Sequence, residues 1–151
     1  MKSVEYSRGE FTVSTDRSRL DLKLVHDFLR ASYWAKDIPR DVFVKSVENS
    51  LCFGIYEGPG QIGFARVITD YATFAYLADV FIIESHRRRG LANFLMECIV
   101  QHPQLQGLRR WTLATRDAHQ LYAKFGFKPL GRPDRFMELH NAEVYKKAAI
   151  G

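Results

Sequence analysis

The sequence lacks a long apolar run and has only two cysteines in 151 residues. No segment approaches the ~18 consecutive apolar residues of a membrane-spanning helix, so we expect no membrane partner. Cys52 and Cys98 form no Cys-x-x-Cys pair, and no metal or redox site is expected. The first residues have neither the apolar core nor the cleavage site of a secretory signal. Two isolated thiols and this beginning predict a cytoplasmic location.

The sequence also lacks internal repeats, low-complexity tracts and linkers, which predicts one domain over residues 1–151. A hydrophobic content of 46% with 26% charged residues is typical of a soluble globular protein with a core of its own. The net charge is +5, from 22 basic and 17 acidic residues. This excess suits an anionic partner, and by itself it leaves both a nucleic acid and a phosphorylated small molecule open.

The periodicity of apolar residues predicts alternating strands and helices. Strands are expected at 11–15, 51–57, 61–69, 73–83, 110–115, 127–130 and 136–139. Helices are expected from a Ser18-x-x-Asp21 capping box to about Trp34, from Pro39 to Val47, from about Arg89 to His102, and from Ala118 to Phe125. The hairpin favours antiparallel pairing, and the strand-helix-strand unit favours one parallel pair. The expected fold class is α/β (α+β), with a mixed, mostly antiparallel central sheet flanked by helices.

The most informative stretch is His86-Arg87-Arg88-Arg89-Gly90-Leu91-Ala92, where an apolar strand meets an amphipathic helix. The small residues at 90 and 92 let a bulky group approach the backbone. The helix start offers unpaired N–H groups and the positive end of its dipole, and the arginines add charge. This combination predicts a site for a phosphate-bearing ligand.

Two motifs carry a resemblance to a known family. The Arg-x-x-Gly-x-Ala of Arg87–Ala92 resembles the Arg/Gln-x-x-Gly-x-Gly/Ala signature of the GNAT superfamily of N-acyltransferases. The segment Leu121–Phe127 resembles the second signature of that family, in which a Tyr precedes Gly-Phe. The expected element order is also similar from residue 11 to about 140. Small stand-alone bacterial members of unassigned substrate are the most similar type.

The resemblance implies acetyl transfer from acetyl-CoA to a primary amine, by direct attack in a ternary complex. The loop amides would hold the pyrophosphate, and the end of the long strand would pair with the pantetheine arm and polarise the thioester carbonyl. Tyr122 would protonate the departing sulfur, against a simpler interpretation as a core tyrosine. Thr115 stands where many members have an Asn that contacts pantetheine. The implied cofactor-binding set is Val80, Phe81, Ile82, Arg87, Arg88, Arg89, Gly90, Leu91, Ala92, Thr115 and Tyr122.

The general base is harder to assign. Asp79 is the carboxylate nearest to the expected thioester, and an aspartate in so apolar a strand needs a partner, catalytic or structural. Strict alternation puts Leu77, Asp79, Phe81 and Ile83 on one face of the sheet, unless a bulge changes the parity. His119 lies one helical turn before Tyr122, at an expected solvent-facing position.

Tyr33 and Trp34 precede the second helix, where the resemblance places the wall of the acceptor pocket. The pair is a candidate for packing on an acceptor or stacking on a cation, and core packing is the alternative. We expect a small amine as acceptor, with a protein lysine or N-terminal amine as second choice. Dimeric relatives leave a homodimer open.

Two functions of other classes compete with this interpretation. A non-catalytic acyl-CoA-binding module would keep the basic loop without needing Tyr122. A nucleic-acid-binding protein would use the arginines, but no aromatic residues interleave them as a single-strand platform requires. We therefore expect no nucleic-acid partner.

Overall fold

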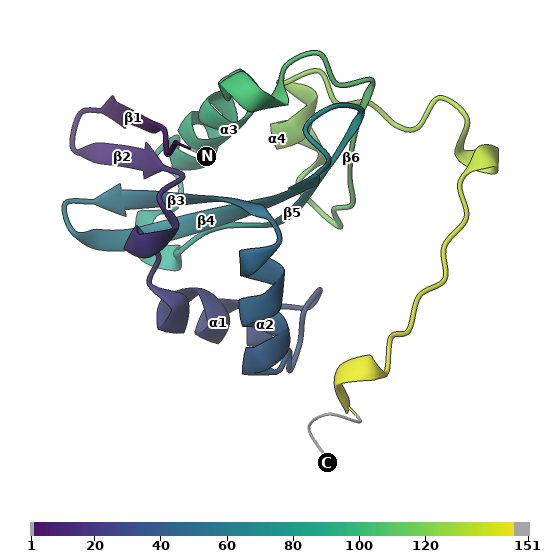
Figure 1. Ribbon diagram of the computed structural model, residues 1–151, viewed down its shortest axis with the longest axis horizontal. Coiled ribbons are helices and arrows are strands. Elements are labelled where there is room, and N and C mark those ends of the chain that lie inside the picture. The colour runs from purple at the N-terminus through teal and green to yellow at the C-terminus, as the bar shows by residue number, and fades with distance from the viewer. Residues whose placement is uncertain (1, 147–151) are drawn as a thin grey trace.

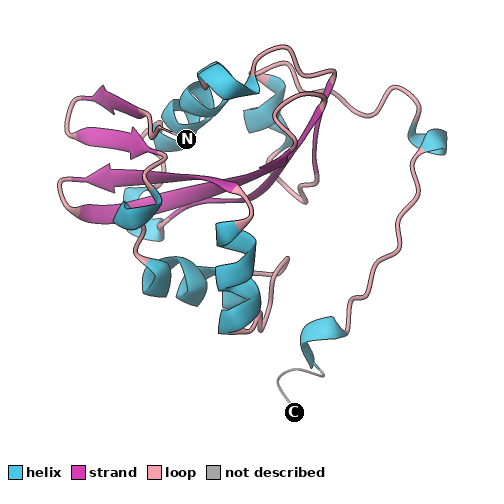
Figure 2. Ribbon diagram, in the orientation of Figure 1, coloured by secondary structure: helices cyan, strands magenta, loops and turns pink. Residues whose placement is uncertain are grey.

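The structure is a computed structural model that describes residues 2–146, and its centre is a six-stranded sheet (Figures 1 and 2). The strands follow one another in sequence order, and every neighbouring pair is antiparallel except the parallel pair β5 and β6. Their bounds are β1 (Glu5–Arg8), β2 (Phe11–Ser14), β3 (Leu51–Glu57), β4 (Gly60–Thr69), β5 (Phe74–Ile82) and β6 (Arg110–Leu113). The expected fold class is confirmed.

Helices cover both faces of the sheet (Figure 1). Helices α1 (Leu22–Arg30) and α2 (Arg40–Glu48) lie on one face, and α3 (Leu91–Gln101) and α4 (His119–Ala123) lie on the other. Short 3-10 turns, at Arg17–Arg19, Glu84–His86, Pro103–Leu105 and Pro133–Arg135, connect these elements or follow the last of them. One core fills the space between the sheet and α3, and a second fills the space between the sheet and the α1/α2 pair.

Helix α1 begins one turn later than predicted. Its N-cap is Asp21, whose side chain accepts a hydrogen bond from the Leu24 N–H at 3.0 Å, whereas Ser18 belongs to a separate 3-10 turn. The predicted Ser18–Asp21 capping box is therefore wrong. The helix also ends at Arg30, before the predicted limit, and the Ser32 hydroxyl donates to the Leu29 carbonyl in the turn that follows. Because α1 ends at Arg30, the residues that follow it can extend toward the centre of the sheet.

A β-bulge interrupts the pairing of β4 with β5. Phe64 faces Phe81, but two residues later Arg66 faces Ala78, so β5 carries one extra residue at this point. Asp79, inside the bulge, has a left-handed backbone with φ of +57°. A bulge of this kind bends its strand and re-aims the side chains that follow it.

The bulge overturns the predicted alternation along β5. Leu77 belongs to the core on the α3 side, whereas Phe81 belongs to the core on the α1/α2 side. There the Phe81 ring stacks on Phe28 with 3.8 Å between centroids. The two residues were expected on one face, and the extra residue between them reverses that relation.

The C-terminal part of the chain also departs from expectation. The predicted strands at 127–130 and 136–139 are not strands, and residues beyond α4 leave the sheet and run alongside the domain (Figure 1). Conversely, β1 was not predicted, because its four mostly exposed residues carry no clear apolar alternation. The sheet in the described part of the chain therefore begins one strand earlier and ends at β6.

The end of β5, just beyond the bulge, packs tightly against Gly63 of β4. A Cβ atom at this position would lie 2.6 Å from the Phe81 carbonyl oxygen and 2.7 Å from side-chain carbons of Ile55 and Ile82. We expect Gly63→Ala to lower the free energy of unfolding by about 1–3 kcal/mol, because backbone atoms cannot yield to the added methyl. Urea denaturation measures the change.

Gly60→Ala, in the same strand, is the matched control, since its Cβ would meet its nearest neighbour at 3.7 Å. Equal losses in the two variants would contradict the close approach at Gly63.

Candidate active site

The loop between β5 and α3 forms an open cradle of backbone amides. Gly90, the N-cap of α3, has φ of +76°, and Arg88 has φ of +65°. Among residues 2–146, no side chain caps the helix and no atom lies within 4 Å of the position that a Gly90 Cβ would take. The first amides of α3 thus face free space at the positive end of the helix, which suits a phosphate group.

Side chains around this loop hold it in place and add charge. The Arg87 guanidinium donates through Nε to the Ile82 carbonyl at 2.9 Å, which ties the loop to the end of β5. His86 Nε2 lies 3.0 Å from a carboxylate oxygen of Glu57. Arg89 lies over the Phe11 ring at 5.2 Å from its centroid, and Arg88 is exposed. The predicted loop residues are therefore together; Arg87–Gly90 are exposed, whereas the Leu91 side chain is buried in the core.

The end of β5 has a free edge toward β6. These two strands pair only from Phe74 with Arg110 to Leu77 with Leu113. Beyond that point, among residues 2–146, no strand faces Val80–Ile82 on this side, while β4 still pairs on the other. Apart from the Ile82 carbonyl, which accepts from Arg87, the backbone groups on this side are not paired with a strand and lead toward the amide cradle, so a ligand chain can add there as a short strand.

A cleft of about 480 Å³ opens where β5 and β6 part. It brings together most of the predicted central residues from four separate segments of the chain. Its lining includes Tyr33, Trp34, Arg66, Tyr76, Asp79, Val80, Thr115, Arg116 and Tyr122. The amide cradle of residues 88–92 lies at the other end of the free β5 edge and is not part of this lining.

Asp79 is held from two sides inside this cleft. Arg66 Nε donates to one carboxylate oxygen at 2.8 Å, and Trp34 Nε1 donates to the other at 2.8 Å. The Asp79 and Arg66 side chains are 9% and 16% exposed. The opposite charges of Asp79 and Arg66 compensate each other. Either charge alone, shielded from water to this extent, would lower the stability of the fold. Asp79 thus has the structural partner that the sequence analysis required.

Tyr122 is buried at the base of the cleft, on α4. Burial, with a smaller contribution from Tyr33, raises the pKa of its phenol to about 12. The hydroxyl therefore keeps its proton at neutral pH and is available as a donor. Thr115 accepts a hydrogen bond from the Ala118 N–H at 3.0 Å and so shapes the turn that leads into α4. His119 is exposed, as expected.

Tyr33 and Trp34 form the rim of the cleft. They are 51% and 42% exposed, and their rings meet edge to face at 5.1 Å. The Tyr33 hydroxyl accepts a hydrogen bond from the Arg116 backbone N–H, and the Arg116 guanidinium lies 3.9 Å from the Tyr33 ring centroid. The pair thus bridges the turn after α1 and the loop after β6, and it is not core packing.

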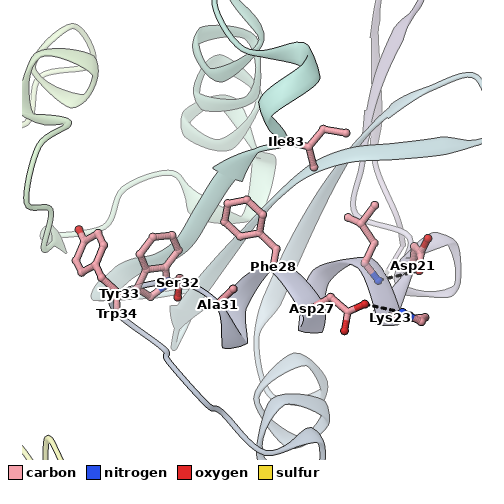
Figure 3. A pocket seen from close by; sticks show the side chains of 10 residues that line it. Asp21, Lys23, Asp27, Phe28, Ala31, Ser32, Tyr33, Trp34 and Ile83 are labelled. Atoms are coloured by element: carbon pink, nitrogen blue, oxygen red, sulfur yellow. Dashed lines mark hydrogen bonds and ion pairs between the residues drawn. The ribbon is translucent and has the colours of Figure 1, made fainter.

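A second hollow, of about 730 Å³, lies on the α1 side of the same rim (Figure 3). Tyr33 and Trp34 stand at one end of it, and Phe28 and Ile83 point toward it from α1 and from the end of β5. Because the two hollows share the aromatic pair, they form two sides of one open region along β5.

Among the cleft residues to which sequence reasoning gave no role are Arg66, Tyr76 and Arg116. Arg66 could have been found from the sequence, because an arginine inside the apolar run of β4 needs a partner for its charge. Tyr76 was placed on β5 without a role. Arg116 gave no signal, since its contact with Tyr33 joins positions 83 residues apart.

The ion pair gives a test of what holds the bulge. We expect Arg66→Ala and Asp79→Ala each to lower the free energy of unfolding by about 3 kcal/mol, because each leaves a shielded charge unpaired. The double variant should lose clearly less than the sum of the two. Urea denaturation of the four proteins measures the coupling.

The exposed pair Arg132 and Asp134, joined at 2.9 Å, is the matched control and should show no measurable coupling. Strict additivity of the Arg66 and Asp79 substitutions would contradict a stabilising pair.

No group of side chains suited to hold a metal ion occurs among residues 2–146, and within that same range no helix is long and apolar enough to cross a membrane.

Comparisons with known proteins point to one family. A family model described as an acetyltransferase (GNAT) domain matches residues 48–129. A protein of Gibberella zeae, named as a candidate acetyltransferase, is 32% identical, with 82% of this chain and 81% of that protein covered. The matched range includes the bulge, the amide cradle and Tyr122.

Solved structures agree on the fold. A candidate acetyltransferase of the GNAT family from Xanthomonas campestris is 50% identical with a TM-score of 0.87, covering 89% of this chain and 96% of that one. A candidate acetyltransferase from Clostridium acetobutylicum, solved with acetyl-CoA, has a TM-score of 0.54 at 14% identity, covering 92% and 95%. At that identity the second likeness concerns the fold alone.

Proposed function

The chain belongs to the GNAT family of acetyltransferases, and from this premise we propose that it moves an acetyl group from acetyl-CoA to a primary amine. The amine attacks the thioester directly, within a ternary complex. The observation that carries the proposal is the free edge of Val80–Ile82, which runs from the cleft to the uncapped amides of α3.

The cofactor fits this path in three parts. Its diphosphate lies on the backbone amides of residues 88–92, beside the exposed arginines. Its pantetheine arm hydrogen-bonds to the backbone groups of Val80–Ile82 that neither β4 nor Arg87 occupies, as an added strand would. The thioester then reaches the bulge, close to Tyr122. The acetyl-CoA bound to the Clostridium protein supports this choice of donor.

The chemistry needs a neutral amine, a fixed donor for the carbonyl and a proton for the sulfur. A free alkyl amine has a pKa of about 10, so the cleft must desolvate it or pass its proton to water. A backbone N–H at the end of β5 stabilises the charge that develops on the carbonyl oxygen. The new C–N bond forms as the C–S bond breaks. Tyr122 gives its proton to the departing sulfur and takes one back through water from the attacking nitrogen, so the phenol ends the step protonated.

In this proposal Asp79 contacts the acceptor amine. Both of its oxygens already receive a hydrogen bond, from Arg66 and from Trp34. Each oxygen retains a lone pair, so the incoming amine or a water can donate to it. The catalytic contribution proposed for Asp79 is to orient the amine, and through Trp34 it also fixes the aromatic rim.

The acceptor proposed is a small amine. The cleft of about 480 Å³ has three aromatic side chains in its lining, those of Tyr33, Trp34 and Tyr76. These rings can pack on an apolar body or stack on a cationic group. A protein lysine or N-terminal amine remains the second choice, and it would enter over the same rim.

Cofactor binding tests the amide cradle. We expect Gly90→Val to abolish the rise in melting temperature that acetyl-CoA gives the unchanged protein, because the side chain fills the space in front of the helix start. Differential scanning fluorimetry with acetyl-CoA up to millimolar concentration measures the shift.

Gly107→Val is the matched control, because Gly107 has the same left-handed backbone, with φ of +77°, and equally open surroundings. It should lose stability to a similar extent and keep the shift. Loss of the shift in both variants, or in neither, would contradict the assignment of the cradle.

Turnover tests the proton donor. We expect Tyr122→Phe to lower kcat by about 10²-fold while the affinity for acetyl-CoA stays nearly unchanged, because the hydroxyl acts only as the sulfur departs. Release of free thiol, assayed against a panel of small amines, measures kcat, and calorimetry measures binding of acetyl-CoA.

Tyr56→Phe serves as the control, since Tyr56 is another buried tyrosine and its hydroxyl has no hydrogen-bond partner in the described part of the chain. It should leave kcat unchanged. If Tyr122→Phe turns over at the normal rate, Tyr122 has no part in the mechanism. If no amine releases thiol although acetyl-CoA binds, the protein is an acyl-CoA-binding module.

A further inference from the structure

The charged side chains in the described lining of the cleft form two pairs of different kinds. Arg66 and Asp79 are the shielded pair at the bulge. Arg116 and Asp117 form an outer pair, with side chains that are 65% and 68% exposed and a nitrogen–oxygen distance of 3.5 Å. An ion pair this exposed contributes little to stability. The outer pair therefore supplies the charges that a ligand can reach and bind.

Arg116 is held at the rim of the cleft from two sides. Its backbone N–H donates to the Tyr33 hydroxyl at 3.2 Å, and its guanidinium carbon lies 3.9 Å from the Tyr33 ring centroid. Within residues 2–146 the Asp117 side chain has no comparable support, since its ion pair is the long contact with Arg116. Of the two outer charges the cation is thus the preorganised one, and a ligand that binds it loses less conformational entropy.

A guanidinium placed in this way suits a carboxylate. Its planar set of N–H donors matches the two oxygens of a carboxylate, which arginine binds through two parallel hydrogen bonds. The Asp117 carboxylate, at 3.5 Å, lies outside the usual range of such bonds. A carboxylate on a ligand can therefore replace this long contact with shorter, charge-assisted hydrogen bonds.

The aromatic rim connects this cation to the carboxylate at the bulge. Tyr33, which lies against Arg116, meets Trp34 edge to face at 5.1 Å (Figure 3). Trp34 in turn donates a hydrogen bond to Asp79 at 2.8 Å. Arg116 and Asp79 thus stand at the two ends of one surface of ring atoms. An acceptor that lies along these rings presents one end to a cation and the other end to an anion.

An acceptor with a second cationic group would meet the wrong charge at the outer end of the rim. The Tyr33 ring already has a guanidinium over it, so this face of the ring is not open to another cation. An ammonium group placed there would lie next to Arg116, and like charges repel each other. The net charge of +5 acts in the same direction at longer range. The surface favours an anionic end on the acceptor.

We propose that the acceptor is an aminocarboxylate, whose amine lies at Asp79 and whose carboxylate is bound by Arg116 at the outer end of the rim. The inference rests on the proposed function, because it names the chemical class of the amine that receives the acetyl group. Since the rings of Tyr33 and Trp34 separate the two binding groups, several carbon atoms separate the amine from the carboxylate. Arg116 determines specificity and takes no part in the bond changes.

Matched acceptors test the need for the carboxylate. β-Alanine, γ-aminobutyrate and ε-aminocaproate form a series of increasing length, and each has an amide of equal length that lacks the negative charge. At the preferred length we expect kcat/KM to be about 10-fold or more higher for the acid than for its amide, because the amide cannot accept charge-assisted hydrogen bonds. Release of free thiol at saturating acetyl-CoA measures both rates.

Arg116→Ala tests the residue that binds the carboxylate. The substitution removes the guanidinium and keeps the backbone N–H that bonds to Tyr33. KM for the preferred acid should rise about 10-fold with kcat nearly unchanged, because the lost contact is the same in the ground state and the transition state. The amide should show no change in kcat/KM. Arg116→Glu should reverse the preference, so that hexamethylenediamine is used better than ε-aminocaproate.

Arg110→Ala is the matched control, because Arg110 is also exposed and lies over an aromatic ring, that of Phe136, but does not line the cleft. It should leave kcat/KM unchanged for every acceptor. Equal kcat/KM for acids and amides, or equal losses on both in Arg116→Ala, would overturn the inference and leave acetyl transfer intact. If no amine of any kind releases thiol although acetyl-CoA binds, the proposed function itself is contradicted, and the inference with it.

Discussion

The bulge at Asp79 is the constraint on which the rest of the site depends. β5 contains one extra residue with a left-handed backbone. Beyond this residue the end of β5 diverges from β6. Pairing between the two strands stops at Leu77 and Leu113, and the backbone beyond is left free on that side. Such a conformation persists only when its surroundings hold it, and here Arg66 and Trp34 do so. The opened sheet follows from this local irregularity.

From this point the site extends in two directions. Toward α3, the free edge of β5 ends at an uncapped helix start that Arg87 ties to Ile82. In the other direction, the rim of Tyr33 and Trp34 is anchored to the same carboxylate that stabilises the bulge. A single buried charge pair thus joins the position where we place the thioester to the wall where we place the acceptor. The contacts that stabilise the bulge would thus also serve the proposed function.

Much of the fold was accessible from sequence because it rests on local periodicity. The hairpin of β3 and β4, the long β5 and the amphipathic α3 follow from apolar spacing, and they were predicted with small errors at their ends. The start of α1 was misplaced because Ser18 and Asp21 both suit a cap, and only the observed hydrogen bond to Leu24 distinguishes them. The segments at 127–130 and 136–139 have the composition of strands, but strand formation needs a partner edge that a sequence does not display.

The site, like the fold, was predictable from the sequence only in part. The amide cradle and Tyr122 lie in short motifs, so their positions were predicted, and the structure brings Tyr122, Thr115, Asp79 and the aromatic pair into one cleft. The roles of these residues remain predictions. Strict alternation along β5 does not hold, because one inserted residue reverses every later side chain. A bulge was the exception allowed for, and alternation alone cannot reveal whether it occurs. Arg116 and its contact with Tyr33 arise from chain folding over a long separation.

A crystal structure of the protein with bound coenzyme A would show whether the cofactor follows this path. The diphosphate should accept hydrogen bonds from backbone amides within residues 88–92. The pantetheine arm should lie along the free edge of Val80–Ile82, with its sulfur beside the Tyr122 hydroxyl. A complex in which the coenzyme binds elsewhere, or in which the protein's own chain pairs with that edge of β5, would contradict it.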